Sequence, residues 1–165
     1  LIGLASDGLH TNGYSLARKL FFEIQGCTPD TRFPELGESL GEALLRPHRM
    51  YAPALLKLTN EYDIKGIAHI TGGGLPDNLP RSLAEGCLAR IDKASWQVPP
   101  IFQLMQRLGN ITEDEMFHTF NMGVGAVVIV PEAQSQAIIG RLTELGESAF
   151  VIGEVVAGER GVSLV

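Results

Sequence analysis

The 165-residue sequence has few groups that could cross-link it or hold a metal. Cys27 and Cys87 are its only cysteines, and neither lies in a Cys-x-x-Cys pair or a Cys/His cluster. Structural zinc is therefore not expected, and we predict no metal bound by this chain. Two reduced thiols are typical of a cytoplasmic protein, which is the location we expect.

Long apolar runs and an excess of basic residues are also missing. No run has the length of a membrane span, and no signal-peptide pattern opens the chain. The 13 Lys and Arg residues against 19 Asp and Glu give a net charge of −6. Since nucleic acids and membrane surfaces attract a basic face, neither is an expected partner. Any phosphate ligand would have to be bound by local loops.

The residues that are present predict one folded domain over 1–165, since 45% are hydrophobic and 19% charged. Apolar periodicity alternates between helix and strand, which indicates an α/β or α+β fold, a mixed β-sheet covered by helices. The first residue is Leu1, inside an apolar run, so we expect a piece of a longer protein. We predict strands at 1–4, 64–70, 87–91, 126–130, 149–157 (with a bulge at Gly153) and 162–165, and helices at 13–25, 39–45, 51–62, 76–83, 100–109 and 131–146, with a shorter one from 112.

The loop at 6–18 joins the first strand to the first helix. Backbone N–H groups at a helix N-terminus favour an anion, and this loop adds hydroxyl, amide and imidazole groups. His10 could donate to a phosphate or shuttle a proton. The alternative is a solvated turn in which Asn12 caps the helix. The candidate binding residues of this loop are Ser6, Thr11, Asn12 and Gly13.

A second loop, His69 to Gly74, carries three consecutive glycines between a strand and a helix. Because glycine is costly to order, such a run indicates a purpose, and its N–H groups could converge on an anion. It is neither a Walker A loop nor a GxGxxG motif. A bulged turn between packed backbones is the alternative, and His69 could equally be a buried, satisfied side chain. We expect Gly73→Val to weaken ligand binding with little unfolding.

A third loop spans 119–125. Asn121 could hydrogen-bond a ligand, and Gly123 and Gly125 could admit close contact; alternatively, Asn121 ends a helix before a strand that crosses another backbone. Arg46, Arg49 and Arg81 could clamp phosphates, although each alone is more often a surface ion-pair residue.

Five motifs in order resemble one family, the C-terminal domain of phosphoribosylformylglycinamidine cyclo-ligase, also called aminoimidazole ribonucleotide (AIR) synthetase. They are S-D-G-L-H-T-N-G-Y-S-L-A-R at 6–18, R-P-H-R-M-Y at 46–51, A-H-I-T-G-G-G-L-P-D-N-L-P-R at 68–81, W-Q-V-P-P-I-F at 96–102 and T-F-N-M-G-V-G at 119–125. The resemblance runs from about Gly3 to Gly153. Selenophosphate synthetase, thiamine-monophosphate kinase and a hydrogenase-maturation protein share the domain plan but not this set of loops.

The resemblance implies an enzyme that closes the imidazole ring of formylglycinamidine ribonucleotide with ATP in purine biosynthesis. It implies a partly ferredoxin-like sheet, a homodimer in the full-length enzyme, and an N-terminal domain, absent from this chain, that makes most of the contacts to ATP and Mg²⁺. The isolated fragment would be inactive. Two alternatives stay open: another ATP-dependent enzyme of the superfamily, or a non-catalytic phosphate- or nucleotide-binding module.

The resemblance also implies roles for particular residues. His10 matches the histidine of the family's small-residue loop and is expected at the reacting end. Asp7 departs from the Ser-Ser-Gly of many members and adds negative charge beside a supposed anion site. The residues expected to bind substrate or phosphate are Ser6, Thr11, Asn12, Gly13, Thr71, Gly72, Gly73, Gly74, Asn121 and Gly123.

Overall fold

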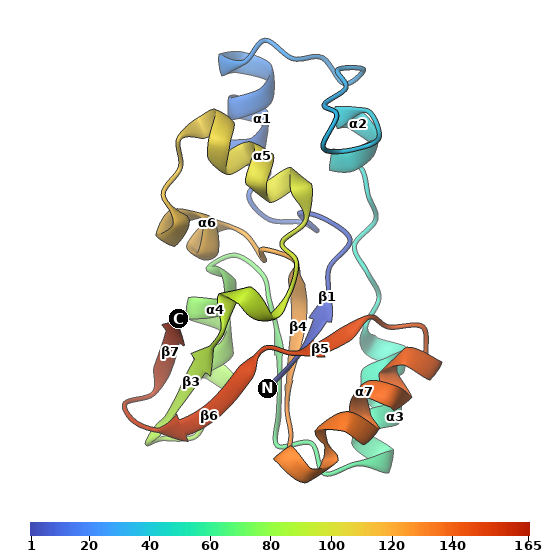
Figure 1. Ribbon diagram of the computed structural model, residues 1–165, viewed down its shortest axis with the longest axis vertical. Coiled ribbons are helices and arrows are strands. Elements are labelled where there is room, and N and C mark those ends of the chain that lie inside the picture. The colour runs from blue at the N-terminus through green and yellow to red at the C-terminus, as the bar shows by residue number, and fades with distance from the viewer.

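The computed structural model, which describes residues 1–165, contains two β-sheets (Figure 1). The larger sheet has the order β2-β4-β1-β5, and every neighbouring pair is antiparallel. This is the strand order of a ferredoxin-like βαββαβ sheet, which confirms that part of the prediction. Its strands are β1 (Ile2–Ala5), β2 (Gly66–His69), β4 (Val124–Ile129) and β5 (Ala149–Val151).

Two helices cover one face of the larger sheet. They are α3 (Ala52–Glu61), which lies between β1 and β2 in the chain, and α7 (Ser135–Glu144), which lies between β4 and β5. Alternate strand residues point toward them because successive side chains of a strand face opposite sides. The nine fully enclosed residues of this layer are Ile2, Leu4, Tyr51, Ala54, Leu58, Ala126, Val128, Ile138 and Leu142.

The smaller sheet corrects the prediction of a single sheet. It consists of β3 (Cys87–Ile91) between the antiparallel β6 (Gly153–Ala157) and the parallel β7 (Gly161–Leu164). The predicted strand 149–157 divides at the buried Ile152, so its first part joins the larger sheet and its second part the smaller one. A Cβ at Gly153 would lie 2.0 Å from the Arg90 carbonyl oxygen, so glycine permits this change of sheet rather than a bulge.

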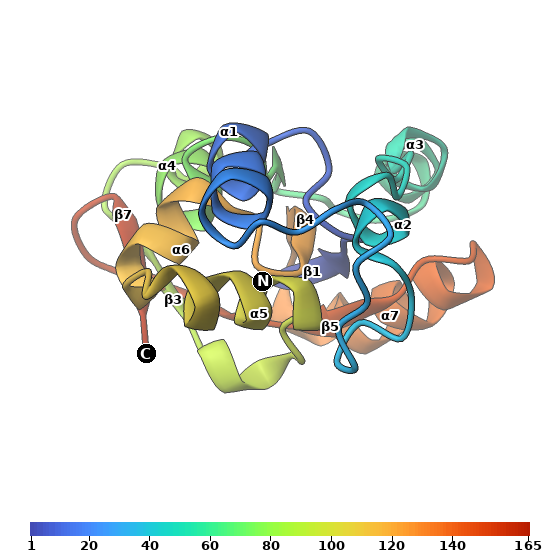
Figure 2. The ribbon, with the colours of Figure 1, turned by 90° about the horizontal axis from the view of Figure 1, so that it is seen from above.

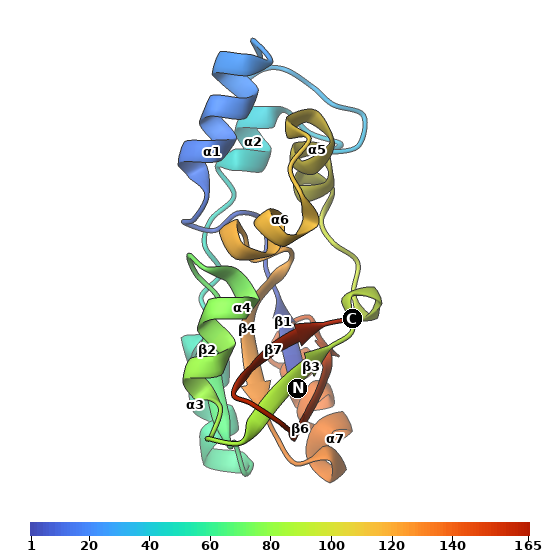
Figure 3. The same cartoon turned by 90° about the vertical axis from the view of Figure 1, so that its left-hand side faces the viewer.

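The remaining helices gather at the end of the molecule opposite α3 and α7 (Figures 1 and 3). Figure 2 looks onto this helical end, with β1 and β4 behind it. A core of 28 buried residues joins it to the two sheets. The helices are α1 (Tyr14–Arg18) with a π-helical continuation (Lys19–Ile24), α2 (Leu40–Leu44), α5 (Pro100–Gly109) and α6 (Glu113–Thr119). Helix α4 (Gly74–Asn78) packs against α6 and β7.

Helix caps follow the sequence signals in part. Ser39 and Glu42 form the reciprocal capping box of α2. Thr112 caps α6 by accepting from the Glu115 amide, but the Glu115 carboxylate accepts from Thr119 instead of reaching back. The predicted helix at 76–83 begins earlier, at Gly74, and turns into a 3₁₀ helix, Leu79–Ser82. Three-residue 3₁₀ turns occupy Lys93–Ser95 and Glu132–Gln134. None of the helices is both long and apolar enough to cross a bilayer.

Candidate functional site

The first and third loops are tied together by the buried side chain of Asn121. Its Oδ1 accepts from the Ser6 hydroxyl and the Gly123 amide, both at 2.8 Å, and its Nδ2 donates to the Gly8 carbonyl at 2.9 Å. The Ser6 amide in turn donates to the Gly123 carbonyl at 2.9 Å. Both Oδ1 and Nδ2 of Asn121 are engaged by these bonds, as is the Ser6 hydroxyl. Ser6 and Asn121 therefore hold the two loops together and do not point toward a ligand.

The first and second loops meet through one side-chain contact. The Thr71 hydroxyl donates to Oδ1 of Asn12 at 3.2 Å, although the two residues are 59 positions apart. Thr11, between His10 and Asn12, is exposed. Asn12 does not cap the helix, since Gly13 stands at the cap position without a side-chain bond. The alternative of a simple capped turn is therefore wrong.

Asn78 fixes the backbone of the triple-glycine loop. Its Nδ2 lies 3.2, 3.1 and 2.8 Å from the carbonyl oxygens of Thr71, Gly72 and Gly74, and the residue is buried. Sequence reasoning missed it as a functional residue. The available signal was an amide placed four residues after a glycine at a helix start, where it can reach back to the loop.

The glycines of these loops divide into two kinds. A Cβ at Gly13 would lie 2.0 Å from the Phe120 ring, and one at Gly74 would lie 1.8 Å from the Phe117 carbonyl oxygen. Close packing therefore requires both glycines. A Cβ at Gly72 would meet only Oδ1 of Asn12 within 4 Å, at 3.5 Å.

Gly73 is constrained by its own backbone. Its φ of +95° is left-handed, and a Cβ there would lie 2.6 Å from the Asp77 side chain. The expectation that Gly73→Val would cause little unfolding is therefore wrong. The amides of Gly72 and Gly73 donate no hydrogen bond within the chain. They remain available to an external acceptor, as an anion-binding loop requires.

Because Gly123 and Gly125 have no side chain, other side chains of the chain can pack directly against their backbone. A Cβ at Gly123 would lie 2.5 Å from Cδ of Pro99, and one at Gly125 would lie 2.1 Å from the Tyr51 hydroxyl. The Tyr51 hydroxyl donates to the Ala5 carbonyl at 2.7 Å, and burial raises the pKa of its phenol. These glycines let the loops pack closely around the β1 and β4 ends.

His10 is enclosed among these loops. It is 3% exposed and has a left-handed φ of +57°. Its Nε2 accepts from the Asp7 amide at 3.3 Å, and its Nδ1 has no partner. The ring stacks on His48, with centroids 4.2 Å apart. Burial, with a smaller contribution from His48, lowers the pKa of His10 to about 4, so the imidazole is neutral at pH 7.

A row of three imidazoles extends outward from His10. Nε2 of His48 lies 3.2 Å from Nε2 of His69, on β2, and burial together with His48 lowers the pKa of His69. His48 was quoted in the sequence motif but not predicted as a site residue. Its contacts with His10 and His69 depend on the folded chain, which brings the 46–51 segment next to β2. His48 and His69 line an open groove of about 360 Å³, together with Met50, Tyr51, Leu55 and Ile67, whereas His10 does not reach it.

Arg49 neutralises the negative charge that Asp7 adds to the first loop. Its Nη1 lies 2.9 Å from Oδ1 of Asp7, and its Nε lies 2.8 Å from Oε2 of Glu147. Burial opposes the charge of Arg49, but the two carboxylates raise its pKa overall. Arg46 donates to the Asp7 carbonyl at 3.3 Å, while Arg81 is exposed and forms no ion pair. The predicted phosphate clamp is therefore not assembled from these arginines.

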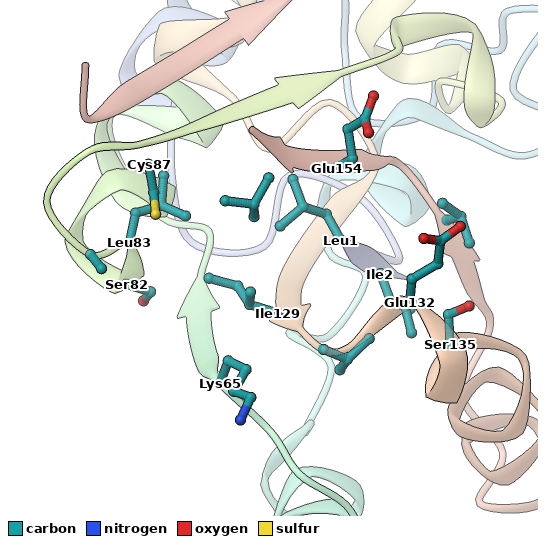
Figure 4. Close-up of a pocket in the computed structure, with 14 residues that line it drawn as sticks. Leu1, Ile2, Lys65, Ser82, Leu83, Cys87, Ile129, Glu132, Ser135 and Glu154 are labelled. Carbon is teal, nitrogen blue, oxygen red and sulfur yellow. The ribbon is translucent and has the colours of Figure 1, made fainter. Parts of the chain in front are cut away.

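A separate hollow of about 410 Å³ lies between the two sheets (Figure 4). Leu1 and Ile129 line its wall, with Lys65 and Glu154 at its edges. It contains none of the predicted site residues. The candidate site is thus the junction of the three loops and not this hollow.

A family described as AIR synthase related protein, C-terminal domain, matches residues 1–165. The chain belongs to this family. It is 54% identical over 168 residues to the phosphoribosylformylglycinamidine cyclo-ligase of Citrifermentans bemidjiense, and 51% identical over 169 residues to that of Syntrophotalea carbinolica. Each alignment covers 100% of this chain and 48% of the relative. The chain therefore spans about half the length of the curated relatives it matches.

Solved structures of more distant proteins share the fold of this AIR synthase related domain. Escherichia coli HypE, a hydrogenase maturation protein, matches with a TM-score of 0.60 at 20% identity, over 99% of this chain and 46% of that one. Thiamine-monophosphate kinase from Stenotrophomonas maltophilia K279a matches with a TM-score of 0.61 at 19% identity, over 99% and 49%. At these identities the likeness concerns the fold alone, and it confirms the predicted fold class.

Proposed function

We propose that this chain is the C-terminal half of a phosphoribosylformylglycinamidine cyclo-ligase. The full-length enzyme would use ATP to close formylglycinamidine ribonucleotide to aminoimidazole ribonucleotide in purine biosynthesis. The observation that carries the proposal is the junction of the loops through Asn12 and Thr71. That junction leaves the Gly72 and Gly73 amides and the His10 Nδ1 without partners in a domain of this family.

The reaction requires the formyl oxygen to become a leaving group. Transfer of the ATP γ-phosphoryl group to that oxygen would give ADP and a phosphorylated intermediate. The ring-closing nitrogen would then attack the formyl carbon, and the C–O bond would break to release phosphate. Such a reaction depends on positioning and on stabilising charge at oxygen, which uncharged donors held by a rigid framework can supply.

The proposal divides the predicted residues by what their side chains contact. Ser6, Gly13, Gly74, Asn121 and Gly123 are engaged within the chain and form the framework. The set that would face a ligand is His10, Thr11, Asn12, Thr71, Gly72 and Gly73, in which the Asn12 and Thr71 side chains hydrogen-bond only to each other. Of these, the Gly72 and Gly73 amides suit a phosphate, since they are donors without partners in the chain.

Magnesium does not fit this chain by itself. No three His, Cys, Asp or Glu side chains lie together as a metal site, and Asp7 is bound to Arg49. We therefore assign Mg²⁺ and most ATP contacts to an N-terminal half of the full-length protein, which would also form the homodimer. A cytoplasmic location is part of the same proposal, and both cysteines are free thiols.

The test is turnover by the full-length protein that contains this chain. Formylglycinamidine ribonucleotide, ATP and Mg²⁺ should give aminoimidazole ribonucleotide with ADP and phosphate in equal amounts. Selenide with ATP and thiamine monophosphate with ATP serve as comparison substrates. Turnover of either one, without the cyclo-ligase product, would contradict the proposal. ATP binding without turnover of any substrate would favour a non-catalytic module.

A further inference from the structure

The imidazole of His10 has one nitrogen in use and one without a partner. Nε2 accepts a hydrogen bond from the Asp7 amide at 3.3 Å. A backbone N–H can only donate, so Nε2 must present its lone pair. A neutral imidazole with a free Nε2 lone pair carries its proton on Nδ1. The unpartnered atom is therefore an N–H donor.

A buried hydrogen-bond donor without a partner is costly, so the His10 Nδ1–H requires an acceptor. His10 is 3% exposed, and Nδ1 has no hydrogen-bond partner in the chain. Nearly all buried polar groups of folded proteins are paired with protein, water or ligand. The chain itself supplies no acceptor for this N–H, so it is available to an oxygen atom from outside the chain.

The surroundings of His10 oppose the imidazolium form. A second proton would have to sit on Nε2, where it would face the Asp7 N–H and abolish that hydrogen bond. The His10 ring stacks on His48, with centroids 4.2 Å apart, and the tilted Tyr51 ring lies 6.0 Å away. His48 is paired with His69, and the Asp7 carboxylate is already occupied by Arg49. Asp7 raises the pKa of His10, but burial and the neighbouring His48 lower it by more.

We propose that His10 acts as a fixed neutral donor, giving its Nδ1–H to a carbonyl or phosphoryl oxygen of the substrate, and not as a general base or a cation. In the cyclo-ligase reaction this oxygen belongs to the formyl group, so that part of the inference rests on the proposed function. A neutral histidine donor stabilises charge that grows on oxygen without transferring its proton completely. It is a catalytic residue in the sense that it touches the reacting atoms.

The tautomer can be observed without any reaction. Long-range ¹H–¹⁵N correlation spectra of the ¹⁵N-labelled 165-residue chain distinguish a protonated ring nitrogen from an unprotonated one. We expect His10 to show protonated Nδ1 and unprotonated Nε2 from pH 8 down to pH 5. An Nε2–H tautomer, or an imidazolium at pH 7, would overturn the inference whatever the enzyme's substrate is.

Two amide substitutions test the donor role in the full-length protein. In His10→Asn the side-chain amide replaces Nδ1, and asparagine tolerates the left-handed backbone of this position. In His10→Gln the amide instead replaces Nε2. We expect kcat of His10→Asn within about tenfold of wild type, and a loss of about a hundredfold or more in His10→Gln, as for removal of one oxyanion donor.

His10→Ala provides the reference without a donor if His10→Gln does not fold. The donor role is wrong if His10→Asn is as inactive as His10→Ala while its thermal unfolding matches wild type. Failure of the wild-type protein to convert formylglycinamidine ribonucleotide would remove the proposed function instead. The nuclear magnetic resonance result would still decide the tautomer in that case.

Discussion

Oδ1 of Asp7 lies 2.9 Å from Nη1 of Arg49, although 42 residues separate the two in the chain. The same guanidinium also holds Glu147 at 2.8 Å and donates to the Gly146 carbonyl at 3.0 Å. Asp7 thus belongs to an ionic link between the first loop, the segment before α3 and the turn before β5. Its charge is compensated, so it need not repel an anion bound near the loop.

Replacing Arg49 should therefore affect both stability and the site. Arg49→Met keeps the length of the side chain but leaves the Asp7 and Glu147 carboxylates without their cation. Glu147 is only 9% exposed, so we expect a loss of about 1.5–3 kcal/mol in the free energy of unfolding. Urea denaturation of the 165-residue chain measures this loss.

Arg46→Met is the matched control, because Arg46 also reaches Asp7 but is itself exposed and pairs with the half-buried Glu38. It should cost less than about 1 kcal/mol, as surface ion pairs do. Equal losses in the two variants would show that Arg49 is an ordinary surface residue.

Much of the framework could be predicted from local patterns. The apolar run at 126–130 is β-branched and continuous, and it forms the central strand β4. Ser39 and Glu42 carry a complete capping signal, and α2 begins there. The positions of these elements depend on residues close in sequence, so they can be predicted from local sequence patterns alone.

The long-range pairings could not be predicted in the same way. The division of 149–157 at Ile152 depends on the carbonyl of Arg90, which is more than 60 residues away. The stack of His10 on His48 depends likewise on where two loops meet. The sequence predicts Asn121 and Gly13 as ligand contacts because amide side chains and glycines suit both ligand binding and tight packing. Only the partner atoms distinguish the two uses.

The burial of neutral His10 makes stability depend on pH. Its pKa is lowered from 6.5 to about 4, so between these values the unfolded chain binds more protons than the folded one. Stability contributed by this residue is complete above pH 6.5 and decreases as the pH falls to 4. The loss at pH 4 would be up to about 3 kcal/mol.

Urea midpoints of wild type and His10→Asn at pH 7.5, 5.5 and 4.5 measure the effect of His10. The difference between the two proteins should shrink or reverse on the acid side. A constant difference across these pH values would contradict a lowered His10 pKa.

Substituting His48 should change the titration of its neighbours. His48 is a smaller cause of the lowered pKa of both His10 and His69, after burial. His48→Phe keeps an aromatic ring over His10 but removes the charge, so both pKa values should rise while staying below 6.5. Histidine Cε1–H chemical shifts followed against pH report each value. If His48→Phe leaves both titrations unchanged, the coupling within the imidazole row is absent.

The Asn121 side chain should contribute more to the free energy of unfolding than an amide side chain on the surface does. Asn121→Ala removes one donor and two acceptor contacts at a residue that is 3% exposed, leaving the Ser6 hydroxyl, the Gly8 carbonyl and the Gly123 amide without these partners. We expect a loss of about 2–4 kcal/mol in the free energy of unfolding. Ser6→Ala removes only one of these bonds and should cost about 1 kcal/mol. Similar losses in both variants would argue against Asn121 as the fastening residue.

Within the triple-glycine loop, Gly74 is needed for packing, whereas Gly72 has space around it. Gly74→Ala would place a methyl group 1.8 Å from the Phe117 carbonyl oxygen at a φ of +58°, so α4 or α6 must move. We expect it to lose about 3 kcal/mol or more in the free energy of unfolding. Gly72→Ala has only the Asn12 Oδ1 near its methyl, at 3.5 Å, and should change stability by about 0.5 kcal/mol or less.

Gly72→Ala also tests whether the free amides of Gly72 and Gly73 bind the substrate. A methyl at Gly72 would crowd an oxygen approaching the Gly72 and Gly73 N–H groups, so KM for formylglycinamidine ribonucleotide or for ATP should rise about tenfold in the full-length protein, with a smaller change in kcat. Unchanged KM values for both substrates, in a variant of wild-type stability, would mean that the loop is only a tight turn. Because Gly72 lacks the steric constraint of Gly73 and Gly74, the result cannot be attributed to unfolding.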